Sequence, residues 1–109
     1  MVMAAAAKRE SGKKREGAGL YEAFAALRDA DEAARFLRDL ATPAELAAFA
    51  ERWRIARMLD EGALSYREIA AATGASTTTV GRVARFLREE PHQGYRTMLD
   101  RLETDEFRE

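Results

Sequence analysis

The chain contains no cysteine, only one histidine and only two prolines among its 109 residues. Without cysteine it can form neither a disulfide framework nor a thiolate metal site, and one histidine is too few for a site built from imidazole nitrogens. No apolar run approaches the roughly 20 residues that a helix needs to span a bilayer. The basic residues near the N-terminus follow the short apolar stretch, whereas a secretory signal has the opposite order. We therefore expect a cytoplasmic protein with no metal, no cofactor and no membrane partner.

Strand-like alternation of β-branched residues is also missing, and alanine supplies much of the 47% apolar fraction. Both features favour an all-α fold. A short helical chain rich in alanine buries a thin core, and association with another chain is a common remedy for that deficit. The composition therefore predicts a small all-α domain and favours an oligomer.

The net charge of −1 conceals an uneven distribution along the chain. Residues 8–16 and residues 65–88 each carry a net charge of +3, whereas residues 89–109 carry −4. Residues 1–19 also have almost no large apolar side chain, so we expect them to form a disordered basic arm. Such an arm either adds non-specific attraction to nucleic-acid phosphates or remains an inert, solvated tail.

Apolar residues recur at helical spacing over most of the remaining chain. This periodicity predicts six helices, which cover about residues 20–28, 31–40, 43–61, 65–73, 76–90 and 91–102. No turn motif separates the first two, so they could be nearly continuous, with Asp29 or Asp31 as the N-cap of the second. We place the helical domain at residues 20–103 and expect the acidic tail, residues 104–109, to fray beyond Thr104.

The third of these helices has a clear beginning and end. Thr42 is a suitable N-cap, with Pro43 at the first helical position and Glu45 at the third, which combines a capping box with the preferred site for proline. Gly62 follows the last turn, where a left-handed residue commonly ends a helix. Trp53, in the middle of this helix, is interpreted as part of a dimer core rather than as a surface that stacks on a ligand.

The segment from Ser65 to Leu87 has the pattern of a helix-turn-helix. Ser65 begins a capping box, and its helix ends about two turns later at Gly74, which can adopt the left-handed conformation that a tight turn needs. Ala70 is small enough to let a second helix approach, and Ser76 caps that helix directly after the turn. The residues expected to point inward and fix the interhelical angle are Ile69, Val80 and Val83.

Three threonines, Thr77, Thr78 and Thr79, open the second helix. Threonine has a low helix propensity, so this choice disfavours helix stability but suits recognition. Its hydroxyl can bond to base edges or phosphates, its methyl can pack on the methyl of thymine, and the N-terminal end of a recognition helix enters the major groove. The pattern predicts sequence-specific binding of double-stranded DNA. The alternative is a two-helix corner whose threonines are exposed by chance.

Four arginines accompany this motif. Arg67 and Arg82 are placed to reach a backbone phosphate or a small anionic ligand, and Arg85 and Arg88 suit phosphate or solvent. His92 is expected on the solvated surface. No pair of carboxylates, pocket motif or metal-ligand spacing suggests catalysis, so we predict that the protein is not an enzyme.

A family resemblance rests on four short stretches, Leu40–Glu45, Arg52–Arg57, Gly62–Ala70 and Gly74–Arg82. Together they resemble the tryptophan-repressor superfamily, and in particular its YerC/YecD-type members, over about residues 40–91. The resemblance implies a bacterial regulator that is an intertwined homodimer of six-helix subunits. Its two helix-turn-helix heads would enter successive major grooves of a pseudo-palindromic operator.

The resemblance also implies which residues contact DNA. The family's recognition contacts match Arg67, Thr77, Thr78, Thr79 and Gly81 here. A contacting threonine of the repressor is replaced by Gly81, so we expect a different operator. The full set of predicted DNA-binding residues is Arg67, Ser76, Thr77, Thr78, Thr79, Gly81, Arg82 and Arg85.

A second implied site would hold the tryptophan corepressor, through residues that match Thr42, Arg52 and Arg82. Two positions depart from the family pattern. Val83 stands where the repressor has a glycine and should crowd the indole, and Phe86 replaces a serine that helps to hold the amino group. We therefore predict a regulator that does not use tryptophan.

The sequence leaves two alternative functions open beside a dimeric repressor. One is a regulator gated by an amino-acid-like ligand in the cleft between Arg52 and Arg82. The other is a protein-interaction adaptor that kept the fold and lost DNA binding, an idea supported by the acidic residues 89–109. Arg52 could also have a structural role, either in a dimer cleft or paired with Asp60 or Glu89.

Overall fold

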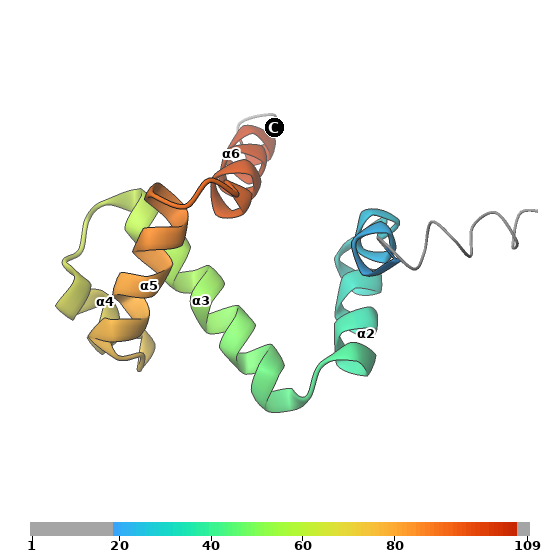
Figure 1. Cartoon of the computed structure of the whole chain (residues 1–109), viewed down its shortest axis with the longest axis horizontal. Coiled ribbons are helices and arrows are strands. Elements are labelled where there is room, and N and C mark those ends of the chain that lie inside the picture. The colour runs from blue at the N-terminus through green and yellow to red at the C-terminus, as the bar shows by residue number, and fades with distance from the viewer. Residues whose placement is uncertain (1–18, 107–109) are drawn as a thin grey trace, which may run out of the picture. The chain divides into compact units, whose positions relative to one another are not determined.

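The computed structural model describes residues 19–106, with side chains for residues 19–103. These residues form six helices and no strand, as predicted (Figure 1). They divide into two compact units, one ending at Thr42 and the other beginning at Pro43. The predicted basic arm lies outside the described residues except for residue 19, which is helical. No helix in this part of the chain is long and apolar enough to cross a bilayer.

The N-terminal unit contains a helix over residues 19–25 and α2 (Ala30–Leu40). Asp29 separates the two because its backbone is extended, and its carboxylate accepts a hydrogen bond from the N–H of Glu32 at 2.8 Å. The Glu32 carboxylate in turn accepts a hydrogen bond from the N–H of Arg28 at 3.0 Å. The prediction that the first helix reaches Arg28 and nearly continues into the second was therefore wrong. The N-cap, Asp29, is one of the two predicted candidates.

The C-terminal unit contains four helices, α3 (Pro43–Glu61), α4 (Tyr66–Thr73), α5 (Thr77–Arg88) and α6 (Gly94–Glu106). Helix α3 has the predicted bounds, and Gly62 follows it with a left-handed φ of 73°. Helices α4 and α5 pack against each other and against α3, and α6 contacts both α3 and α5 (Figure 1). Helix α3 is therefore the support on which the helix-turn-helix is built.

Helix α6 differs from the prediction at both ends. It begins at Gly94 instead of Pro91 because Gln93 adopts a left-handed φ of 58°, and the Gln93 carbonyl then accepts hydrogen bonds from the N–H and hydroxyl of Thr97 at 3.0 and 2.8 Å. It continues to Glu106, so the prediction of fraying beyond Thr104 was wrong for the next two residues. No proline or glycine interrupts the helix in this stretch.

The core of the described residues lies entirely in the C-terminal unit. Its nine buried residues are Ile55, Ala56, Leu59, Ile69, Val80, Val83, Ala84, Leu87 and Leu99. Helix α5 supplies four of them at a spacing of three and four residues, which places them on one helical face. The inward positions predicted for Ile69, Val80 and Val83 are confirmed, since each is at most 1% exposed. The opposite face of α5 consequently points away from the core.

Candidate functional site

The first helix of the motif begins with the predicted capping box. The Ser65 hydroxyl accepts a hydrogen bond from the N–H of Glu68 at 3.1 Å, and the Glu68 carboxylate accepts one from the N–H of Ser65 at 2.9 Å. The hydrogen bond that the Ser65 N–H donates to the carboxylate, with a smaller contribution from the Ser65 side chain, lowers the pKa of Glu68 below its ordinary value. Two backbone N–H groups that the helix cannot satisfy are thus paired, and the start of α4 is fixed.

The turn between the two helices is held by Gly74 and Thr73. Gly74 has a left-handed φ of 82°, and its N–H donates to the carbonyl of Ala70 at 2.9 Å. The Thr73 hydroxyl donates to the carbonyl of Ile69 at 2.8 Å and accepts a hydrogen bond from the N–H of Ala75 at 3.3 Å. Gly74 was predicted to make this turn, whereas the role of Thr73 was missed. A hydroxyl residue directly before the turn glycine is the sequence signal that could have indicated it.

The three threonines of α5 do not have the same environment. The Ser76 hydroxyl accepts a hydrogen bond from the N–H of Thr79 at 3.1 Å and lies 3.1 Å from the Thr79 hydroxyl. Thr79 is thus engaged in the helix cap. Thr77 and Thr78 are exposed, and neither hydroxyl forms a hydrogen bond with another described residue. Two of the three hydroxyls are therefore available to a partner outside the chain.

The arginines of the motif also differ in what they contact. Arg67 is exposed and has no ion pair or hydrogen bond among the described residues. The guanidinium carbons of Arg82 and Arg85 lie 4.7 and 5.2 Å from the ring centroid of Phe86, close enough for cation–π attraction. Arg85 also lies 3.7 Å from the carboxylate of Glu90. Of the predicted phosphate-binding arginines, Arg67 is the one whose charge is least committed within the chain.

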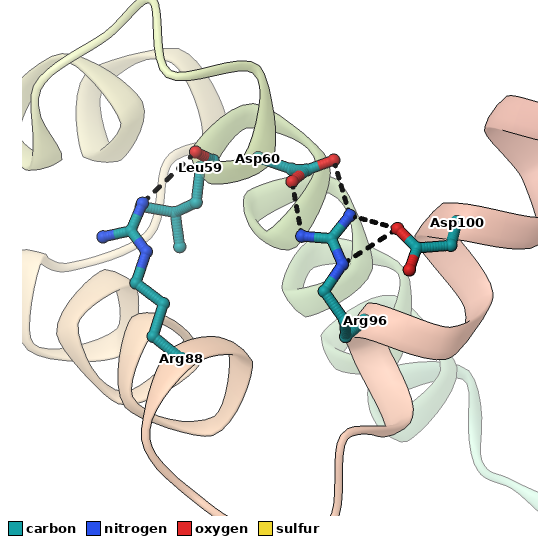
Figure 2. Close-up of polar contacts among 5 residues, drawn as sticks. All are labelled: Leu59, Asp60, Arg88, Arg96 and Asp100. Atoms are coloured by element: carbon teal, nitrogen blue, oxygen red, sulfur yellow. Dashed lines mark hydrogen bonds and ion pairs between the residues drawn. The ribbon is translucent and has the colours of Figure 1, made fainter.

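Arg88 has a structural role that its sequence position did not reveal. Its guanidinium donates to the backbone carbonyl of Leu59 at 3.3 Å, which joins the end of α5 to α3 (Figure 2). A second, longer hydrogen bond of 3.5 Å reaches the hydroxyl of Tyr66 at the start of α4. The interpretation of Arg88 as a residue for phosphate or solvent missed both contacts. Arg88 links all three helices that form and support the helix-turn-helix.

Arg96 of α6 lies between two carboxylates, those of Asp60 and Asp100 (Figure 2). Its two terminal nitrogens lie 2.7 and 3.3 Å from the two carboxylate oxygens of Asp60 in α3, and its Nε donates to Asp100 at 2.9 Å. The guanidinium lowers the pKa of Asp60, and the two carboxylates raise the pKa of Arg96. Asp60 is therefore not the partner of Arg52, which has no ion pair among the described residues.

A hollow of about 540 Å³ lies between α3, α5 and α6. Its lining residues are Arg52, Trp53, Arg82, Val83, Phe86, His92, Gly94, Tyr95 and Met98. Trp53 stacks on Tyr95 with ring centroids 6.4 Å apart, and Phe86 stacks on His92 at 6.1 Å. The hollow thus has aromatic walls and two guanidinium groups at its surface.

The structure supports some of the sequence predictions for the residues of this hollow and not others. Val83 is buried in the wall of the hollow, and the expectation that it would crowd an indole there stays a prediction. His92 is exposed, as predicted, although it also stacks on Phe86. Arg52 and Arg82 lie at the same hollow, whereas Thr42 belongs to the N-terminal unit. Among the side chains of residues 19–103, no three acidic or histidine residues gather as they would around a metal ion.

Comparison with known proteins identifies the family. Residues 18–103 match the model of the Trp repressor protein family. The uncharacterised protein YerC of Bacillus subtilis (strain 168) is 40% identical over 87 residues, which cover 80% of this chain and 82% of YerC. The sequence therefore aligns over the helical region that contains the helix-turn-helix.

Solved structures agree with this assignment. A TrpR-like protein from Eubacterium eligens ATCC 27750 is 39% identical, with a TM-score of 0.70 over 77% of this chain and 84% of that one. A candidate Trp repressor from Staphylococcus aureus is 32% identical, with a TM-score of 0.71 over 78% of this chain and 83% of that one. Sequence and fold lead to the same conclusion: the chain belongs to the Trp repressor family, which is a family of regulators and not of enzymes.

Proposed function

We propose that the protein is a homodimeric transcriptional repressor that binds double-stranded operator DNA through α4 and α5, in the cytoplasm and without tryptophan as corepressor. The observation that carries this proposal is the N-terminal end of α5. There Thr77 and Thr78 are exposed with free hydroxyls, on a helix whose other face is locked into the core. Family membership supports the same class of function.

Rigidity of the motif favours base recognition over a chance surface. Side chains that read base edges must be held by a scaffold that does not move between complexes. Here Ser65 and Ser76 cap both helices, Gly74 closes the turn, and Arg88 ties α5 to α3. The threonines therefore project from a fixed frame, which suits direct readout in the major groove.

Charge supports the same surface. Residues 65–88 carry a net charge of +3, although the whole chain carries −1. Arg67, on α4, has its guanidinium free within the described residues and can neutralise a phosphate. The helix-turn-helix can thus attract DNA although the chain as a whole is slightly negative.

The apolar surface of the N-terminal unit favours a dimer. Helix α2 contains no buried residue, and Leu20, Phe24 and Leu40 are 50%, 39% and 50% exposed. Exposed apolar side chains of this size mark an interaction surface. A second copy of the chain would cover them, and two helix-turn-helix heads would then meet half-sites about one helical turn apart on the operator.

The experiment is selection of bound sites from a pool of random double-stranded DNA, followed by affinity measurement for the selected site and for unrelated DNA across a series of salt concentrations. We expect a pseudo-palindromic site that the protein prefers by at least about a thousandfold at physiological salt. Light scattering of the complex should give two chains per site. Uniform weak binding with no enriched sequence would contradict the proposal, and a protein partner retained without DNA affinity would favour an adaptor instead.

The hollow supports a second candidate function, a regulator gated by a small ligand. Its aromatic walls fit an apolar side chain, and Arg52 and Arg82 at its surface suit a carboxylate. Calorimetry with the individual amino acids tests this candidate, with the Arg52→Ala variant as the control for the guanidinium contact. Heat from one amino acid that disappears in the variant would support it, and no binding by any of them would contradict it.

A further inference from the structure

Gly81 lies in the interior of α5, one turn after Thr77, where glycine is an unfavourable choice. Apart from proline, glycine is the residue least compatible with a helix interior, because it loses the most backbone entropy on folding. Gly62 and Gly74 are explained by their left-handed φ values of 73° and 82°, but Gly81 has no such conformation. Backbone geometry therefore does not require glycine at this position.

Packing does not require it either. A Cβ atom built on Gly81 would meet no heavy atom within 4 Å in the described part of the protein. The buried residues of α5 are Val80, Val83, Ala84 and Leu87, so position 81 lies beside the buried face and not at its centre. Neither the backbone nor the packing of the described residues therefore gives a reason for glycine at position 81, which points to a partner.

The position of Gly81 indicates what that partner is. Residues four apart lie on the same side of a helix, so the partly buried Gly81 lies one turn after the exposed Thr77, at the border of the buried face of α5. Beyond the first turn of a helix, each backbone N–H is hydrogen-bonded to a carbonyl of the same helix. The surface that a glycine exposes there is therefore mainly the apolar Cα–H group. In the major groove, the apolar group that projects from a base pair is the C5-methyl of thymine.

We propose that Gly81 is a specificity-determining residue, whose missing side chain leaves a notch in the recognition helix that accepts the methyl group of one thymine. This inference rests on the proposed DNA-binding function and deepens it. A side chain at position 81 would occupy the notch and hold α5 away from the base pairs beneath it. Contacts to phosphates further from the notch would be less affected, so specific binding suffers more than non-specific binding.

The test compares Gly81→Ala with the wild-type protein on the operator selected by the wild type. We expect about tenfold weaker binding to that operator, with little change on unrelated DNA. At equal protein concentration the variant should also melt about 4–8 °C higher, because alanine favours the helix. Glu103→Ala, at an exposed site of α6, is the control and should leave both affinities unchanged.

Replacement of thymine by deoxyuridine identifies the base pair, because it removes only the methyl group. At one position of the operator, deoxyuridine should weaken binding of the wild type and restore most of the affinity that Gly81→Ala has lost. Three outcomes would overturn the role of Gly81 while leaving the proposed function intact. They are equal operator affinity of the variant and the wild type, a lower melting temperature of the variant, and the lack of any position at which deoxyuridine restores the affinity of the variant. Failure of the wild type to select any site would contradict the proposed function as well.

Discussion

Arg96 of α6 holds Asp60 of α3 by two hydrogen bonds, of 2.7 and 3.3 Å, across 36 residues of sequence (Figure 2). The same guanidinium binds Asp100 one turn further along α6. The side chains of Arg96 and Asp60 are 36% and 30% exposed, so solvent screens their attraction. The cluster fixes α6 beside α3 and thereby one side of the hollow.

Loss of the bonds between Arg96 and its two carboxylates should lower the stability of the fold modestly. Arg96→Met keeps the aliphatic part of the side chain and removes the charge, and we expect it to reduce the free energy of unfolding by about 1 kcal/mol. Asp31→Asn, which removes the exposed pair with Arg35 within α2, should cost less than about 0.5 kcal/mol. Urea unfolding monitored by circular dichroism measures both. Equal effects of the two changes would show that the Arg96 cluster has no special weight.

The same pair makes stability depend on pH. The hydrogen bond from Arg96 lowers the pKa of Asp60 below its ordinary value of 3.8. A carboxyl whose pKa is lower in the folded state stabilises the fold above its unfolded pKa and loses that contribution as the pH falls through the folded pKa. The stability difference between the wild type and Asp60→Asn should therefore shrink from about pH 6 to about pH 2. A difference that stays constant over this range would contradict the assignment, and comparison of the two proteins cancels the parallel effect of Glu68.

Gly74 should resist substitution for a reason confined to the backbone. Its φ is 82°, and a Cβ atom there would meet nothing within 4 Å. Gly74→Ala should lower the free energy of unfolding by about 1 kcal/mol through the left-handed conformation alone. Gly74→Asn should cost less, because asparagine tolerates this conformation. Thermal unfolding orders the three proteins, and a variant with asparagine less stable than the one with alanine would point to a steric cause instead.

Removal of the Thr78 side chain should affect recognition and not folding. The residue is exposed and its hydroxyl is free among the described residues, so Thr78→Ala should leave stability unchanged or slightly raised. On the selected operator we expect a loss of about 1–3 kcal/mol at one base pair, with relaxed preference there. Binding to operators mutated one base pair at a time gives the measurement. A uniform loss on all sequences would mean that Thr78 contacts the DNA backbone.

Replacement of Arg67 should affect DNA binding, whereas replacement of Arg88 should affect stability. Arg67→Ala should weaken binding to all DNA sequences alike and reduce the slope of log affinity against log salt by about 1, without loss of stability. Arg88→Ala should instead lower the free energy of unfolding by about 1 kcal/mol, because it removes the bonds to Leu59 and Tyr66. Salt-dependent DNA titration and urea unfolding of both variants separate the two roles. An unchanged salt slope for Arg67→Ala would exclude its phosphate contact.

Local signals explain how much of the fold could be predicted. The start of α3 at Pro43, the capping box of α4 and the N-cap of α5 depend on residues within one turn, so the sequence alone indicates them. The inward face of α5 follows from periodicity in the same way. The start of α6 could not be predicted, because glutamine at position 93 gives no sign of a left-handed φ.

Long-range contacts were beyond the sequence for a different reason. Arg96 meets Asp60 from 36 residues away, and Arg88 meets the Leu59 carbonyl from 29 residues away. No rule of sequence spacing links residues that far apart. Every residue has a backbone carbonyl, so the sequence does not indicate which one Arg88 will bind. The aromatic walls of the hollow could not be predicted, because Trp53, Phe86 and Tyr95 come from three different helices. The bond between Ser76 and Thr79 is local by contrast, and the prediction of Thr79 as a DNA contact did not consider that the predicted cap would engage it.

The absence of buried residues in α2 makes the N-terminal unit depend on whatever covers its apolar side chains. If a second copy of the chain does so, folding of this unit and assembly of the dimer are one equilibrium, governed by mass action. The folded fraction would then rise with the amount of protein in the cell. Substitutions in residues 19–40 would lower abundance through proteolysis of the unassembled chain and leave the DNA contacts of each surviving dimer intact.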